Sequence, residues 1–168
     1  MENARIKQNY FFMKPFAIIT LLMISLSSIA QDNVTQLDWL TNLDEAKEIA
    51  KEENKPILVY FTGSDWCAPC KALKSDFFET EEFATRAQNL VLVMIDYPRR
   101  VDIITEAQRT YNKEVIDTYN PDKAFPTMVM LNKKGKEEGK IAGYSSFNSY
   151  KDTSHHFTFV DESLAKYN

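Results

Sequence analysis

Cysteine is scarce in this chain, because only Cys67 and Cys70 occur among the 168 residues. This scarcity excludes a scaffold held together by several disulfides, the usual device of small secreted domains. A bond between two cysteines so close in sequence closes a very short loop, which restricts the unfolded chain little and contributes little stability. The pair is therefore better explained by the reactivity of its thiols than by a structural role.

Excess positive charge and histidine are lacking as well. The chain has 20 basic against 24 acidic residues, and this mild acidity argues against nucleic acid or an anionic membrane surface as a partner. The two histidines, His155 and His156, are adjacent, so their side chains diverge, and no further cluster of cysteine or histidine has the spacing of a metal site. We therefore expect solvated surface histidines and no bound metal.

The apolar stretch Phe16 to Leu26 is shorter than the roughly 20 residues that a membrane-spanning helix needs. It follows three basic residues and precedes Ser28-Ile29-Ala30, a small-x-small cleavage site. This order is the anatomy of a secretory signal peptide, so we expect cleavage after Ala30 and a periplasmic or secreted protein. An uncleaved anchor is the alternative. No cysteine follows the stretch, which excludes a bacterial lipoprotein anchor.

The residues after Ala30 fit one domain that is large enough to bury a core. We expect residues 1–30 to be the signal peptide, with Met13 as an alternative initiator, and residues 31–168 to form a single domain. Its core is expected at about 37–144. The sequence contains no internal repeat and no low-complexity tract.

Helical and strand patterns alternate along this domain. The apolar run Ile57-Leu58-Val59-Tyr60-Phe61 is typical of a central strand buried on both faces. Helices between such strands indicate parallel βαβ units and an α/β fold. We expect strands at 37–40, 57–61, 90–95, 127–131 and 138–144, the last two as an antiparallel hairpin. We expect helices at 44–53, from 67 to about 78, 80–88, 101–119 and 157–167. The core face of helix 101–119 is expected to carry Ile103, Ala107, Tyr111 and Val115.

The cysteines lie in Trp66-Cys67-Ala68-Pro69-Cys70, which directly follows the first buried strand and its turn. Two thiols with this spacing at the start of a helix can close and reopen a small disulfide ring, and so exchange electrons with the disulfide of another protein. A Cys-x-x-Cys pair in this position of an α/β chain is typical of a thioredoxin-like redox motif. An inert cysteine pair is the alternative.

The chain resembles the thioredoxin superfamily in this motif and in Phe125-Pro126-Thr127, which opens the expected hairpin. The resemblance covers about residues 37–144. Phe61 to Cys67 and Asp96 to Arg100 are more closely similar to exported thioredoxin-like proteins of Bacteroidetes and related Gram-negative bacteria, which also carry an insertion where residues 97–111 stand here. The resemblance implies a central mixed β-sheet with helices on both faces. It also implies a cis peptide bond before Pro126, beside the disulfide.

Within this motif, Cys67 is expected to be the nucleophile, because unpaired N–H groups at a helix N-terminus stabilise a thiolate. Cys70, one turn further along, is expected to be buried and to resolve the mixed disulfide. The residues expected to bind substrate or tune the pair are Trp66, Ala68, Pro69, Phe125 and Pro126.

One departure from the family concerns proton transfer. Thioredoxin has a buried aspartate in the strand before the motif, which helps to move the proton of the resolving cysteine. Tyr60 or Phe61 stands in that place here, depending on how the longer turn is aligned, so the strand offers no carboxylate. Asp65 is expected on the exposed turn, where its charge would disfavour the thiolate of Cys67.

These observations lead to the hypothesis of an exported thiol–disulfide oxidoreductase that acts on protein disulfides without a cofactor. A reductase or isomerase fits better than an oxidant, because nothing polar in Ala68, Pro69 or Phe125 indicates extreme stabilisation of the thiolate. A reductase in an oxidising compartment needs a membrane electron donor. A monomer is expected. The alternative is a non-catalytic binding module that uses the insertion and an exposed Trp66 to hold a partner.

Overall fold

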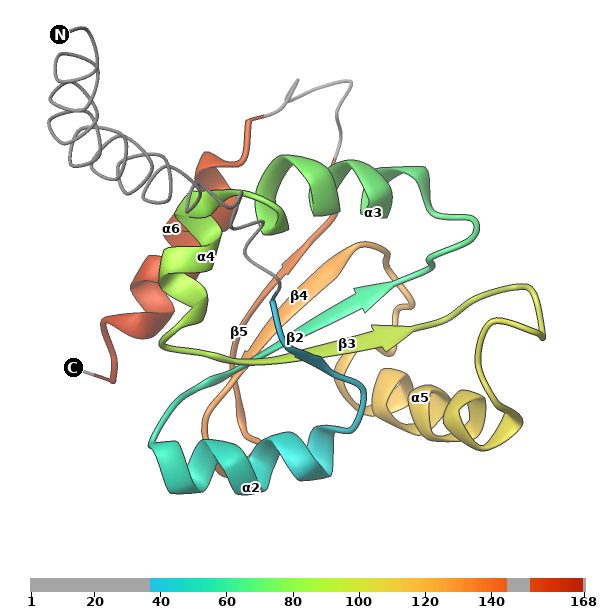
Figure 1. The fold of residues 1–168 in the computed structure, drawn as a ribbon, viewed down its shortest axis with the longest axis horizontal. Helices are drawn as coiled ribbons and strands as arrows, with labels where there is room; N and C mark the ends of the chain where they lie inside the picture. The colour runs from blue at the N-terminus through green and yellow to red at the C-terminus, as the bar shows by residue number, and fades with distance from the viewer. Residues whose placement is uncertain (1–36, 145–151, 168) are drawn as a thin grey trace, which may run out of the picture. The chain divides into compact units, whose positions relative to one another are not determined.

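The computed structural model describes residues 37–144 and 152–167 (Figure 1). In this part of the chain, one mixed sheet has the strand order β1-β3-β2-β4-β5. Its strands are β1 (Trp39–Leu40), β2 (Ile57–Thr62), β3 (Val91–Asp96), β4 (Thr127–Leu131) and β5 (Glu137–Ala142). The helices are α2 (Leu43–Glu53), α3 (Ala68–Leu73), the π-helical segment η1 (Lys74–Phe78), α4 (Glu81–Ala87), α5 (Glu106–Tyr119) and α6 (Ser154–Leu164). None of these helices is long and apolar enough to cross a membrane. The expected signal peptide, residues 1–30, lies outside the described residues.

The sheet combines parallel and antiparallel pairing. Strand β3 runs parallel to both β1 and β2, whereas β4 is antiparallel to β2 and β5 is antiparallel to β4. The parallel pair β2 and β3 is connected through helices, as the alternating pattern predicted, and the hairpin of β4 and β5 is confirmed. Strand β2 therefore lies in the middle of the sheet, and it leads directly into the cysteine motif.

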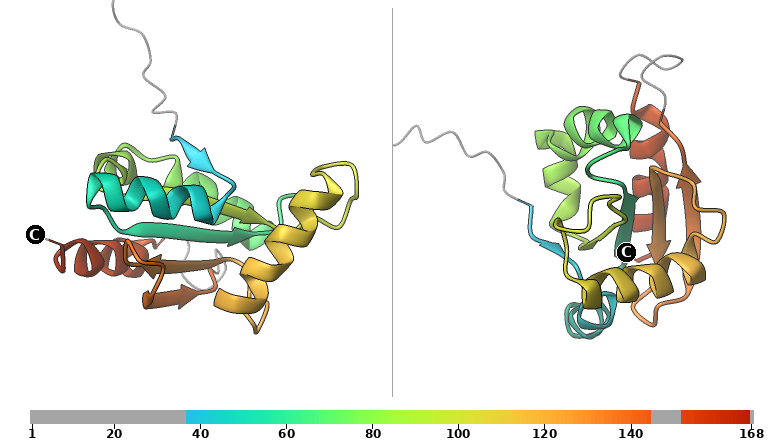
Figure 2. Two further views of the ribbon diagram at one scale, coloured as in Figure 1. Left: turned by 90° about the horizontal axis from the view of Figure 1, so that it is seen from below. Right: turned by 90° about the vertical axis from the view of Figure 1, so that its right-hand side faces the viewer.

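Helices cover both faces of the sheet, as the resemblance implied. Helices α2 and α5 lie on one face, and α3, α4 and α6 lie on the other (Figure 2). Along β2 the side chains alternate between the two layers: Ile57, Val59 and Phe61 pack toward α2 and α5, while Leu58 and Tyr60 pack toward α3. Each fully buried large side chain contributes about 1.5–3 kcal/mol of hydrophobic stabilisation. The continuous apolar run thus fills two cores at once, as predicted.

Helix α5 begins later than the sequence pattern predicted. The expected start was Val101, but residues up to Thr105 form a loop, and the Thr105 hydroxyl caps the helix by accepting the N–H of Gln108 at 3.1 Å. Ile103 was expected in the core and is instead 39% exposed. Tyr111 and Val115 pack against the core as expected. Ala107 was also expected in the core, but it lies in the first turn of α5 and is exposed.

His156 corrects a second prediction, since it is buried whereas His155 is exposed as expected. Helix α6 begins at Ser154 rather than at Phe157, which places His156, Val160 and Ser163 on the face turned to the core. The imidazole lies between the rings of Phe77 and Tyr144, at centroid distances of 5.7 and 5.5 Å. Residues 145–151, just before the helix, are outside the described residues.

Burial is the main reason why the pKa of His156 is lowered, and the charge of His155 lowers it as well. The Gly143 carbonyl and the charge of Asp152 raise the pKa, but their effect is smaller. The folded state therefore resists protonation, while the unfolded chain takes up a proton as the pH falls below about 6.5. We expect the stability conferred by neutral His156 to be full above that pH and to be lost as the pH falls through the lowered folded pKa. Between pH 8 and pH 5.5, the urea midpoint of unfolding should fall more for the wild type than for His156→Gln. His155→Gln, the matched control, should behave as the wild type; equal pH dependence of all three proteins would contradict the assignment.

Candidate active site

The turn between β2 and α3 is closed by Gly63. Its carbonyl accepts the N–H groups of Trp66 at 3.2 Å and of Cys67 at 2.8 Å. A side chain has no room at this position, because an added Cβ would lie 2.3 Å from an indole carbon of Trp66. Cys67 keeps an extended backbone and serves as the N-cap of α3. The turn thus places the first cysteine at the helix N-terminus, as predicted.

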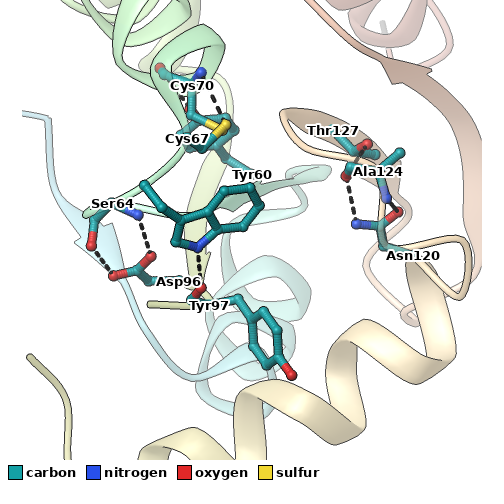
Figure 3. The surroundings of a disulfide bond; sticks show 10 residues. Tyr60, Ser64, Cys67, Cys70, Asp96, Tyr97, Asn120, Ala124 and Thr127 are labelled. Atoms are coloured by element: carbon teal, nitrogen blue, oxygen red, sulfur yellow. Dashed lines mark hydrogen bonds between the residues drawn. A yellow bond between two sulfur atoms is a disulfide. The ribbon is translucent and has the colours of Figure 1, made fainter. Parts of the chain in front are cut away.

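The two cysteines form a disulfide, and both are buried (Figure 3). The Cys70 N–H points at the Cys67 sulfur, at a distance of 3.2 Å. Pro69 lies in the first turn of α3, where a missing N–H leaves no hydrogen bond unmade. When the bond is reduced, this same N–H and the helix dipole are placed to stabilise a thiolate on Cys67. Cys70 has no comparable donor in the first turn.

Aromatic side chains from three segments meet next to the motif. The Trp66 indole donates its N–H to the Tyr97 carbonyl at 2.8 Å, and its ring packs edge-on against Phe125 at 5.5 Å between centroids. The Tyr97 ring stacks on Phe125, with 6.2 Å between centroids. Trp66 is therefore half-buried and fixed in orientation, rather than freely exposed as the binding-module hypothesis assumed.

The peptide bond between Phe125 and Pro126 is cis, as the resemblance implied. The loop before it is fastened by Asn120, whose amide donates to the Ala124 carbonyl at 2.8 Å and accepts the Ala124 N–H at 3.3 Å. The Thr127 hydroxyl donates to the same carbonyl at 2.9 Å. Figure 3 shows Asn120 next to Ala124 and Thr127. Asn120 is buried and had no signal in the sequence beyond its place at a helix end.

Asp65 lies in the turn before Cys67 and has contacts that the sequence did not predict, while its effect on the Cys67 thiolate stays a prediction. Its carboxylate accepts the backbone N–H groups of Arg99 at 3.0 Å and Arg100 at 2.9 Å. Desolvation alone would raise its pKa, but these bonds and the Arg100 charge hold the pKa of Asp65 below the ordinary value. The carboxylate is thus engaged in fixing the loop at 97–105, which was not foreseen because the two partners are backbone groups about 35 residues away.

Three further residues secure this loop. Ser64 binds the Asp96 carboxylate through its N–H and its hydroxyl, at 2.8 and 2.6 Å. Arg109 donates to the carbonyls of Pro98 and Arg100 at 2.8 and 2.9 Å, and Asn112 donates to the Asp96 carbonyl at 2.7 Å. The loop at 97–105 is therefore a well-anchored border of the motif, although Val101 on it is 79% exposed.

Comparison with known proteins identifies the family to which this chain belongs. The model of a family described as thioredoxin-like matches residues 38–133. This chain belongs to the thioredoxin-like family. The protein is 35% identical over 106 residues to the disulfide bond reductase DsbH of Chlamydia pneumoniae, an alignment that covers 62% of each protein. It is 29% identical over 118 residues to the thiol:disulfide interchange protein DsbD of Campylobacter jejuni, covering 70% of this chain and 19% of that protein. The matches thus span less than two thirds of these relatives' own lengths.

Among solved structures, DsbH oxidoreductase superposes on this thioredoxin-like chain with a TM-score of 0.65 at 27% identity, covering 83% of this chain and 92% of the other. This agreement supports the thioredoxin fold. Among the described residues of the present chain, no group of three or more histidine, cysteine, aspartate or glutamate side chains is arranged to hold a metal ion.

Of the two residues that could stand in place of thioredoxin's buried aspartate, only one faces the cysteine pair. Tyr60 points to the layer that contains Cys67 and Cys70, whereas Phe61 points to the opposite layer. The Tyr60 hydroxyl donates to the Cys70 carbonyl at 3.0 Å. A phenol, and not a carboxylate, therefore lies beside Cys70.

Proposed function

We propose that this protein is an exported thiol–disulfide oxidoreductase that reduces or isomerises the disulfides of other proteins. The observation that carries the proposal is the position of Cys67 at the N-cap of α3, with the Cys70 N–H aimed at its sulfur. A thiolate formed there is stabilised by backbone N–H groups and by the helix dipole. The similarity to a disulfide bond reductase and to a thiol:disulfide interchange protein supports the same chemistry.

The proposed reaction has two exchange steps. The Cys67 thiolate attacks one sulfur of the substrate disulfide, which forms a mixed disulfide and releases one substrate thiolate. Cys70 loses its proton and attacks the Cys67 sulfur, which forms the Cys67–Cys70 disulfide and releases the second substrate thiolate. The substrate gains two electrons and two protons in total, and the protein becomes oxidised as the structure shows it.

The surroundings of the pair support a reductase or isomerase rather than a strong oxidant. An oxidant gains its power from strong stabilisation of the reduced thiolate, but Ala68 and Pro69 supply no side-chain hydrogen bond and Phe125 has no hydroxyl to offer. Trp66, Phe125 and Pro126 then give the site an apolar border on which a substrate segment can lie. After each cycle a thiol donor at the membrane has to reduce the pair again.

Export rests on the sequence of residues 1–30 together with the proposed chemistry. Residues 31–168 would be the mature protein and act as a monomer. Mass spectrometry of the protein recovered from the periplasm of a Gram-negative host should give the mass of a chain that begins at Gln31. Recovery of the uncleaved chain in the membrane fraction would contradict cleavage and support an anchor.

Insulin reduction tests the proposed activity. With dithiothreitol as electron source, a substoichiometric amount of the protein should accelerate precipitation of the insulin B chain.

The non-catalytic alternative draws support from Val101, which is exposed on an otherwise well-anchored loop beside the motif. A binding module would leave the rate at that of dithiothreitol alone.

A further inference from the structure

A phenol lies in an otherwise apolar cluster beneath the disulfide. Tyr60 is 1% exposed, and its ring packs against Phe78 at 4.5 Å and Trp39 at 6.0 Å between centroids. Burial raises the pKa of Tyr60 to about 12. The phenol therefore stays protonated at neutral pH and acts as a hydrogen-bond donor, not as a base.

The acceptor of this hydrogen bond is the backbone carbonyl of the resolving cysteine. Tyr60 belongs to the central strand β2, so the bond joins the middle of the sheet to the first turn of α3 at Cys70. Both partners are buried, which makes the bond costly to lose, since an unsatisfied buried group loses its contact with water as well. Figure 3 shows Tyr60 on the sheet side of the cysteine pair.

The helix itself holds the Cys70 carbonyl less firmly than usual. The Lys74 N–H is shared between the carbonyls of Cys70 and Lys71, and from Lys74 onward the helix continues as the π-helical segment η1. A carbonyl oxygen has two lone pairs, so the Tyr60 hydroxyl supplies a second donor where the helical pattern changes. Such π-helical turns are frequent at functional sites.

We propose that Tyr60 is a positioning residue for the resolving thiol, a role that rests on the proposed oxidoreductase function. In the disulfide state a covalent bond holds Cys70 in place, but in the dithiol and mixed-disulfide states that restraint is absent. The Tyr60 bond then keeps the first turn of α3 on β2, and with it the Cys70 sulfur near Cys67. This raises the effective concentration of Cys70, which favours ring closure and speeds release of the bound substrate thiolate.

Tyr60→Phe tests this role, because the variant keeps the ring and removes only the hydroxyl. Tyr119→Phe is the matched control, since the Tyr119 hydroxyl also donates to a backbone carbonyl, that of Gly135 at 2.8 Å, in the turn between β4 and β5. Two quantities are measured on each folded protein: the equilibrium constant for oxidation of the cysteine pair by glutathione, and the rate at which Cys70 displaces glutathione from Cys67.

For Tyr60→Phe we expect both quantities to fall about three- to tenfold, as loss of one hydrogen bond that restrains the reduced states would produce. The equilibrium change corresponds to a reduction potential that is less negative by about 14 to 30 mV. Tyr119→Phe should leave both within a factor of two of the wild type. The rate should keep its pH profile in Tyr60→Phe, because a neutral phenol takes no proton from Cys70.

Other outcomes are equally informative. If Tyr60→Phe loses stability but keeps both wild-type values, the hydrogen bond serves the fold alone and the positioning role is wrong. A changed pH profile would show that the hydroxyl takes part in proton transfer, which also overturns the proposal. If the wild type does not exchange with glutathione at all, the proposed function itself fails, and that result is distinct from the other two.

Discussion

Replacing Cys67 with serine should abolish insulin reduction, lowering the rate to that of dithiothreitol alone. A serine hydroxyl at neutral pH is not ionised and cannot form a mixed disulfide, so the helix N-terminus has no thiolate to stabilise. Loss of the short disulfide ring should lower the free energy of unfolding only a little. Cys67→Ser should therefore remain folded and retain its circular dichroism spectrum. Activity above background in this variant would contradict the assignment of Cys67 as nucleophile.

Cys70→Ser is the matched variant and should have a different defect. Its Cys67 can still attack a substrate, but no second thiol resolves the product, so a mixed disulfide should accumulate after one turnover. Non-reducing gels and mass spectrometry should reveal this adduct, and a reducing agent should cleave its disulfide bond. If Cys70→Ser reduces insulin as fast as the wild type, Cys70 has no resolving role. Substrates trapped in this way would be identified directly.

Gly63→Ala is expected to damage the site through packing alone. The new methyl group would lie 2.3 Å from the indole of Trp66. That ring cannot easily yield, because it is fixed by the Tyr97 carbonyl and by contacts with Phe125 and the Arg99 guanidinium. Overpacking of this kind costs about 1–3 kcal/mol of unfolding free energy. We expect a lower urea midpoint, a shifted tryptophan emission and a higher KM for insulin.

Gly139→Ala provides the control for that substitution. Gly139 lies in β5, where an added Cβ would approach only the edge of the Phe159 ring, at 3.0 Å. A small movement of that ring accommodates the methyl group, and alanine also reduces the freedom of the unfolded chain. The urea midpoint should change little and activity should not change. If Gly63→Ala behaves like this control, Trp66 is not held as tightly as its contacts imply.

The central part of the fold was predictable because its signals are local. The run from Ile57 to Phe61 is apolar at every position, which only a strand covered on both faces requires, and the structure confirms it. The cysteines follow that strand so closely that their place at a helix start needed no long-range information. The cis bond before Pro126, in contrast, came from family resemblance, because most bonds of this type are trans.

The missed features depend on contacts between distant segments. Asp65 binds backbone N–H groups of the loop at 97–105, and no sequence pattern encodes partners of that kind. Whether Tyr60 or Phe61 faces the cysteine pair could be decided only by knowing the layer into which each side chain points. His156 was misplaced because the start of α6 was predicted three residues too late, which hid its place on the core face.

The reduction potential of the Cys67–Cys70 pair tests most directly whether the protein is a reductase or an oxidant. It is measured by equilibrating the protein with glutathione buffers and determining the fraction of disulfide. We expect a value near or below about −230 mV, as for a reductase that must be recharged by a thiol donor. A value near about −120 mV would contradict it, because the protein would then be an oxidant that donates its disulfide.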